Sequence, residues 1–127
     1  MALKLIRLEL ARTAEFPDGS KKHGYEFVAP LGADGHIDLE EWKRYGQACT
    51  MLRFWDDEDD RHGTLVRAKR DRWAFSYEPG DADDEPIYHF ASHAFRAGEY
   101  VTITERDGVA RPFRVASVTD PPALKRS

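Results

Sequence analysis

The sequence predicts a mainly β fold: an antiparallel barrel, closed or half-closed, of about eight strands with one short helix. Three observations support this prediction. The apolar and aromatic runs are short, turn-forming glycine, proline and aspartate residues separate them, and only one segment combines helical spacing with capping residues. Because the predicted strands do not alternate with helices, an antiparallel barrel is favoured over an α/β layout.

Length and composition indicate a single domain. The chain has 127 residues, of which 41% are hydrophobic and 12% aromatic, enough for one core. We expect one barrel-like domain over residues 1–120 and a frayed C-terminal tail over residues 121–127. Cys49 is the only cysteine, and the sequence has neither a signal-peptide pattern nor an apolar run of about 18 residues. These features predict a cytoplasmic protein without a disulfide or a membrane span.

The first two strands are predicted to form a hairpin. Leu3 to Arg12 is rich in leucine and isoleucine, and His23 to Pro30 resumes an apolar, aromatic run after the turn signal Pro17-Asp18-Gly19-Ser20. The apolar positions change phase between Leu5 and Ile6, which is typical of a strand that is bulged or buried on both faces.

One short helix is predicted over residues 38–46. Asp38 can cap its first turn, with Glu41 three positions later, and Gly46 can end it. Leu39 and Trp42 fall on one face, so we expect the helix to cover one end or side of the barrel.

The second half of the chain predicts further hairpins. Cys49 to Trp55 is separated from Thr64 to Ala68 by the acidic segment Asp56 to Asp60, which is expected to be a loop. Trp73, Phe75 and Tyr77 alternate with smaller or polar residues, so this aromatic row is expected to face the barrel interior. The remaining predicted strands are Ile87–Phe90, Tyr100–Glu105 and Pro112–Val118, the last two joined by an Asp-Gly turn.

Charge is unevenly distributed along the chain. The net charge is −4, but nine of the 23 acids lie in two segments, residues 56–60 and 81–85, which leaves 14 acids against 19 lysines and arginines elsewhere. Two acidic turns on a mildly basic body would polarise the surface. Such turns are also common as solvated loops that prevent edge pairing, and this is the interpretation we favour.

His89 and His93 have the i, i+4 spacing that lets two imidazoles share a metal on a helix. The predicted context is a strand end, where the two rings need not share a face, and no glutamate lies between them. We therefore predict no metal site, and retain both histidines as candidate ligand-binding residues.

Two segments resemble the paired motifs of the flavin-binding barrel in ferredoxin-reductase-type enzymes: residues 95–101 and residues 111–117. In that family a tyrosine and a serine follow the arginine and contact the flavin, whereas Phe113 and Arg114 stand in those places after Arg111. We therefore expect a generic hairpin and no cofactor here. Arg111 and Arg114 are the other two candidate ligand-binding residues.

Besides a metal and a flavin, the sequence suggests single-stranded nucleic acid as a ligand. Basic residues precede the aromatic row in the region from Arg67 to Tyr77, and small barrels bind single strands with basic grooves and stacking aromatics. Because the chain is acidic overall and the row is expected to be buried, nucleic-acid binding is not the favoured prediction.

The sequence favours a non-catalytic β-barrel module that binds a partner protein or a small ligand. No coherent catalytic set is found, and Cys49 at the start of a buried strand is expected to behave as a small hydrophobe. The alternatives are a small enzyme or metal site that uses His89 and His93, and single-stranded nucleic-acid binding. The sequence does not decide whether the chain is an enzyme, nor its oligomeric state.

Overall fold

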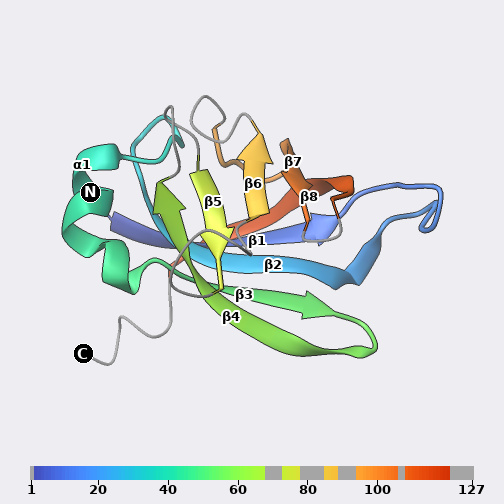
Figure 1. Ribbon diagram of the computed structural model, residues 1–127. Helices are drawn as coiled ribbons and strands as arrows, with labels where there is room; N and C mark the ends of the chain where they lie inside the picture. The colour runs from blue at the N-terminus through green and yellow to red at the C-terminus, as the bar shows by residue number, and fades with distance from the viewer. Residues whose placement is uncertain (1, 68–72, 78–84, 89–93, 106–107, 121–127) are drawn as a thin grey trace.

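A computed structural model describes residues 2–67, 73–77, 85–88, 94–105 and 108–120 of the chain (Figure 1). In this part the predicted mainly β class is confirmed. The strands are β1 (Ala2–Leu10), β2 (Ser20–Leu31), β3 (Thr50–Trp55), β4 (Glu58–Arg67), β5 (Trp73–Ser76), β6 (Glu85–Tyr88), β7 (Tyr100–Thr104) and β8 (Ala110–Thr119). One α-helix, α1 (Leu39–Tyr45), and a 3-10 turn, η1 (Gly46–Ala48), lie between β2 and β3.

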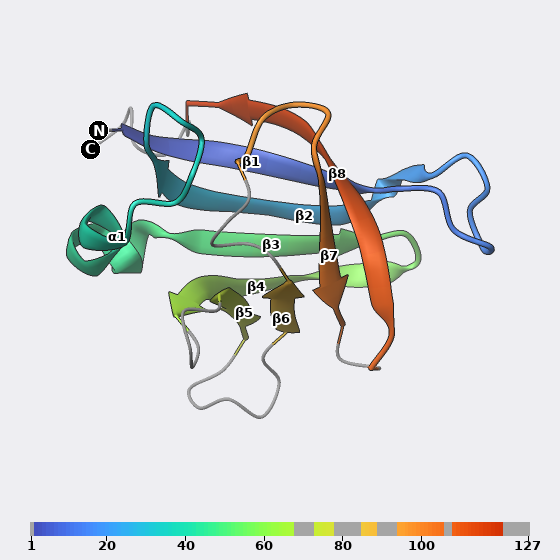
Figure 2. The same ribbon diagram turned by 90° about the horizontal axis from the view of Figure 1, so that it is seen from above.

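The strands form a closed antiparallel barrel in chain order. Each strand pairs with the next one along the chain, and β8 returns to pair with β1. Closure of this kind leaves no unpaired strand edge. In both views α1 lies at one end of the barrel, and the β1–β2 and β3–β4 turns lie at the other (Figures 1 and 2).

Alternating side chains fill the barrel interior. On β1, for example, Ile6, Leu8 and Leu10 are buried and the residues between them are more exposed. The apolar core comprises Ile6, Leu8, Leu10, Tyr25, Phe27, Ala29, Leu31, Cys49, Met51, Leu65, Trp73, Phe75, Phe95, Val101, Ile103, Phe113 and Val115. Aromatic rings from different strands meet within it, since Tyr25 stacks on Phe75 at 5.0 Å between ring centroids.

The apolar residues of β1 change phase between Leu5 and Ile6, and a bulge at that point is not the cause. Leu5 is half-buried on the outer face and Ile6 is buried inside, so the strand carries apolar residues on both faces there. The register against β8 shifts two positions later, between Arg7 and Leu8. Of the two predicted explanations, burial on both faces is the one that applies at Leu5 and Ile6.

The predicted helix is present, and its start is confirmed. The Asp38 side chain accepts a hydrogen bond from the Glu41 backbone N–H at 3.0 Å, which caps the first turn. Trp42 packs edge-on against Trp73, with ring centroids 5.2 Å apart, and its Nε1 donates to the backbone carbonyl of Leu65. These contacts place α1 against one end of the barrel.

The helix ends at Gly46 as predicted, but the conformation of this cap differs from the expected one. Gly46 has φ −56° and ψ −31°, a right-handed conformation, so it does not end the helix as a left-handed cap. The chain instead tightens into the 3-10 turn η1, and the Cys49 backbone N–H donates to the Gly46 carbonyl at 3.1 Å.

The prediction that Asp56 to Asp60 forms a loop is largely wrong. Only Asp56 and Asp57 form the turn, and β4 begins at Glu58, which pairs with Trp55 of β3. Asp57 has φ 70°, a left-handed conformation that aspartate tolerates, and this allows the short connection. Continued pairing with β3 therefore extends the acidic segment into a strand.

The aromatic row on β5 lies inside, as predicted. Trp73 and Phe75 are buried and Tyr77 is partly buried against the core. Ala74 and Ser76, on the alternate positions, are buried as well. Because both faces of β5 are covered, Trp73 and Phe75 have no surface on which a nucleic-acid base could stack.

Candidate functional site

Strand β8 presents the two predicted arginines to opposite sides of the barrel wall. Arg111 shares the inward face with Phe113, whereas Arg114 lies on the exposed outward face. The structure therefore does not bring these two residues together. The other two predicted site residues, His89 and His93, lie outside the described residues.

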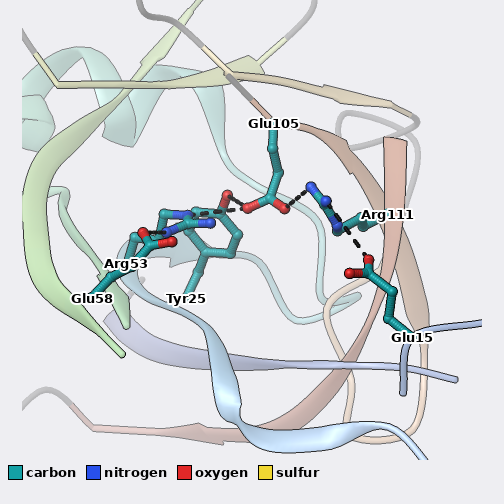
Figure 3. A network of polar contacts seen from close by, with 6 residues as sticks. All are labelled: Glu15, Tyr25, Arg53, Glu58, Glu105 and Arg111. Carbon is teal, nitrogen blue, oxygen red and sulfur yellow. Dashed lines mark hydrogen bonds and ion pairs between the residues drawn. The ribbon is translucent and has the colours of Figure 1, made fainter. Parts of the chain in front are cut away.

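Inside the barrel, Arg111 belongs to a group of charged and polar side chains that we call the Glu105 network (Figure 3). It consists of Glu15, Tyr25, Arg53, Glu58, Glu105 and Arg111. The Glu105 carboxylate, with a side chain only 2% exposed, lies at its centre. Its Oε2 accepts from the Tyr25 hydroxyl at 2.7 Å and from Arg53 Nε at 3.1 Å, and its Oε1 accepts from Arg111 Nη1 at 2.6 Å.

Exposed acids complete the network at the rim. Arg53 Nη1 donates to Glu58 at 3.1 Å, and Arg111 Nη2 lies 4.0 Å from a Glu15 oxygen. Each of the two arginines thus has one buried and one exposed carboxylate partner. A buried charge that has such partners is far less costly than an unpaired one.

The Arg53 guanidinium is held firmly in its charged form. Burial lowers the pKa of Arg53, but the adjacent Glu105 carboxylate and the Tyr25 hydroxyl outweigh this effect, and the pKa lies above its ordinary value. The guanidinium carbon also lies 4.1 Å from the centroid of the Trp55 ring. Arg53 is therefore committed to partners within the barrel.

His23 connects the network to the β1–β2 loop. Its ring is buried between Phe16 and Trp55, with centroid separations of 4.6 and 4.5 Å, and its Nδ1 lies 2.6 Å from the Ser20 hydroxyl. Burial lowers the pKa of His23, and Arg53 acts in the same direction, although the acids at the β3–β4 turn oppose this. The neutral imidazole is thus favoured in the folded chain.

On the outer side of β8, Arg114 lines a groove that we call the Arg114 groove. Its volume is about 330 Å³. The lining residues come from the end of β1, the β1–β2 loop, the start of β2, and strands β7 and β8: Glu9, Leu10, Ala11, Arg12, Asp18, Gly19, Ser20, Lys21, Tyr100 and Arg114. The groove therefore joins segments that lie about a hundred residues apart in the chain.

Local backbone features position the groove wall. Gly19 has φ 74°, and a Cβ at this position would lie 2.8 Å from the Leu10 carbonyl oxygen, so glycine is required where the loop meets β1. The loop is closed by its own hydrogen bonds, in which the backbone N–H groups of Thr13 and Gly19 donate to the Phe16 carbonyl. Across the sheet, Arg114 of β8 pairs with Glu9 of β1 on one side.

The groove contains more free positive than free negative charge. Glu9 accepts a hydrogen bond from Arg7 Nε at 2.8 Å, so this acid is already paired. In the part of the chain that the structure describes, no hydrogen bond or ion pair engages the side chains of Arg12, Lys21 or Arg114. Asp18 is the remaining acid of the groove. Three cations and one acid are thus available to a ligand.

The described residues contain no group of three or more histidine, cysteine or acidic side chains that could hold a metal ion. Cys49 is fully buried, and burial raises the pKa of its thiol to about 11. At neutral pH this thiol is protonated and is a poor nucleophile. Within the described ranges no helix has the length and apolar character needed to cross a membrane.

The sequence prediction names Arg114 but none of the other residues that line its groove. Arg12, Lys21 and Tyr100 belong to two predicted hairpins, and only the closure of the barrel by β1 and β8 brings those hairpins together. The comparisons with known proteins provide no further assignment. A scan against models of protein families found no match, and neither did searches of curated proteins and of solved structures.

Proposed function

We propose that this chain is a non-catalytic β-barrel module that binds a small anionic ligand in the Arg114 groove. The observation that carries the proposal is a set of three cationic side chains that line one groove: Arg12, Lys21 and Arg114. None of them has an acidic partner among the described residues. Elsewhere on the barrel wall, the half-buried Arg7 and the buried Arg53 are both paired with carboxylates.

The size and chemistry of the groove favour a small ligand. A volume of about 330 Å³ is at the lower end of the range for small-molecule sites. An arginine presents several N–H donors in a planar fork that matches a carboxylate or a phosphate, and a lysine adds a mobile point charge. Asp18 and the overall net charge of −4 oppose the binding of a long polyanion.

The absence of catalysis is proposed for a chemical reason. A nucleophile or a general base works best when its pKa lies near the operating pH. Burial moves the pKa of the Cys49 thiol up to about 11 and lowers that of the His23 imidazole, and neither residue lines the groove. The enzyme or metal alternative depends on His89 and His93, so it stays a prediction.

The experiment that tests the proposal is a titration with simple anions. The amide resonances of the ¹⁵N-labelled chain are followed while inorganic phosphate or citrate is added at low ionic strength. We expect saturable shifts centred on Gly19, Ser20 and Arg114. Replacing Arg114 by alanine should weaken binding by about ten-fold or more, because hydrogen bonds to charged groups contribute about 1.5 to 3 kcal/mol.

Arg44→Ala is the matched control, because Arg44 is an exposed arginine on α1, at the opposite end of the barrel from the β1–β2 turn. This variant should bind phosphate and citrate like the original chain. If Arg114→Ala binds them as tightly as Arg44→Ala does, or if the shifts are spread over all surface cations, the proposal is wrong.

A further inference from the structure

Tyr100 is the most exposed large hydrophobic side chain among the described residues, at 56%. It begins β7 and lines the Arg114 groove. Isolated exposed apolar residues are common on protein surfaces. Here, however, the exposed ring adjoins a groove whose cations have no partner within the described ranges, and this coincidence suggests a joint role.

The strand register places Tyr100 beside Arg114. The two residues are direct partners in the β7–β8 pair, and both lie on the outer face. Directly opposed residues in an antiparallel pair have Cβ atoms about 4.5–5.5 Å apart. A ring lying on Tyr100 and an anionic group on Arg114 can therefore belong to one small molecule.

Tyr100 and Arg114 also differ from three other arginine–aromatic pairs of the barrel, in which the guanidinium covers the ring. In three other places a guanidinium carbon lies over an aromatic ring at 4.1 to 4.4 Å from its centroid: Arg7 on Phe54, Arg53 on Trp55 and Arg61 on Tyr77. In the described ranges no such contact covers Tyr100, and its hydroxyl has no hydrogen-bond partner there. Both the ring and the neighbouring guanidinium are thus uncommitted.

We infer that the ligand of the Arg114 groove carries a planar aromatic ring next to its anionic group, and that Tyr100 selects for this ring. The inference rests on the proposed function, since it assigns the ligand class of the same groove. The ring stacks on the exposed face of Tyr100, while Arg114 binds the phosphate or carboxylate with help from Arg12 and Lys21. A mononucleotide and an aromatic carboxylate both have this chemistry.

Matched pairs of probes separate the contribution of the ring from that of the charge. Adenosine 5′-monophosphate is compared with ribose 5-phosphate, which lacks the base, and benzoate is compared with cyclohexanecarboxylate, which lacks the planar ring. We expect the aromatic member of at least one pair to bind about five-fold more tightly or better, because stacking of a base on an aromatic side chain contributes about 1–3 kcal/mol. The pair that shows this preference identifies the source of the anion.

Two variants test whether Tyr100 causes the preference. Tyr100→Leu removes the aromatic ring and should reduce the preference to less than about two-fold, without weakening ribose 5-phosphate or cyclohexanecarboxylate. Tyr100→Phe keeps the ring and should keep the preference. Because Tyr100 is exposed, both variants should unfold within a few degrees of the original chain, and this is checked by thermal unfolding.

The outcomes distinguish this inference from the function on which it rests. If all four probes bind in the groove but the aromatic members gain nothing, or if Tyr100→Leu keeps the preference, the inference is overturned while anion binding stands. If none of the probes, inorganic phosphate included, shifts the resonances of the groove, then the proposed function fails and the inference fails with it.

Discussion

Arg111 and Arg114 are three positions apart on one strand, yet they meet opposite environments. Arg111 points into the barrel, where Glu105 accepts from it at 2.6 Å and Glu15 lies 4.0 Å away. Arg114 points outward into a groove in which, among the described residues, no acid is bonded to it. The alternation of a β-strand thus separates two arginines that are close in sequence into two regions with different charge balance.

We propose that the two regions have different roles. Charges taken out of water require partners, and the Glu105 network supplies them from four strands and two loops, so it stabilises the fold. Exposed cations carry no such requirement, and those of the Arg114 groove remain available to bind an anion. Substitutions in the network should therefore change stability first, and substitutions in the groove should change binding first.

The largest effect is expected from Glu105→Ala. This change leaves the arginines of the network without their central acceptor, and breaking a buried ion pair in this way typically costs about 3–5 kcal/mol. We expect the melting temperature, followed by circular dichroism, to fall by about 8 °C or more. Glu40→Ala, which removes an exposed acid on α1, is the control and should have little effect. A melting temperature for Glu105→Ala within about 2 °C of the control would show that the network does not stabilise the barrel.

A smaller effect on stability is expected from a change of pH. The residue responsible is His23, which lies between the Glu105 network and the β1–β2 loop. Because the pKa of His23 is lowered in the folded state, the unfolded chain binds its proton first as the pH falls. The stability that His23 contributes is fully present above about pH 6.5 and is lost as the pH falls from there to the folded-state pKa. The loss is about 1.4 kcal/mol for each unit by which folding lowers the pKa of His23.

The measurement for His23 is the melting temperature between pH 5 and 7.5, compared with that of His23→Gln. The difference between the two chains isolates the contribution of His23 from that of all other groups. We expect the melting temperature of the original chain to fall more steeply toward acid pH than that of His23→Gln. Parallel pH profiles for the two chains would contradict this role of His23.

The smallest change is expected in the melting temperature when the salt concentration is raised. The affinity for citrate should respond more strongly to the same change. Exposed charges are screened over about 10 Å at 0.1 M salt, whereas buried pairs are screened much less. Raising sodium chloride from about 20 to 300 mM should weaken citrate binding about three-fold or more, while the melting temperature shifts by only a few degrees. Citrate affinity that is independent of salt would argue against the groove cations as its binding site.

Much of the fold follows from local patterns in the sequence. Strand alternation predicts that the aromatic row at Trp73 and Phe75 faces inward, and the Asp38 cap predicts where α1 begins. The prediction of a loop after Trp55 is wrong from Glu58 onward. Pairing with β3 outweighs the low strand preference of Glu58 and of the aspartates that follow it.

The two charged regions could be predicted only in part. Glu105 has the same parity as the buried Val101 and Ile103, which is a signal for a buried acid that the sequence prediction did not use. Its partner Arg53 lies 52 positions earlier, and no local pattern connects the two. The Arg114 groove depends on the closure of the barrel by β1 and β8, which is likewise a property of the tertiary fold.

Arg111→Ala and Arg114→Ala, measured side by side, test the account most directly. For each variant the unfolding free energy and the dissociation constant for citrate are determined under the same conditions. We expect Arg111→Ala to lose about 2 kcal/mol or more of stability, because Glu105 loses a buried partner. At temperatures where this variant is folded, it should keep its affinity for citrate. Arg114→Ala should lose less than about 0.5 kcal/mol of stability and bind citrate about ten-fold more weakly. Equal losses of stability in the two variants, or equal losses of affinity, would contradict the assignment of one face of β8 to stability and the other to binding.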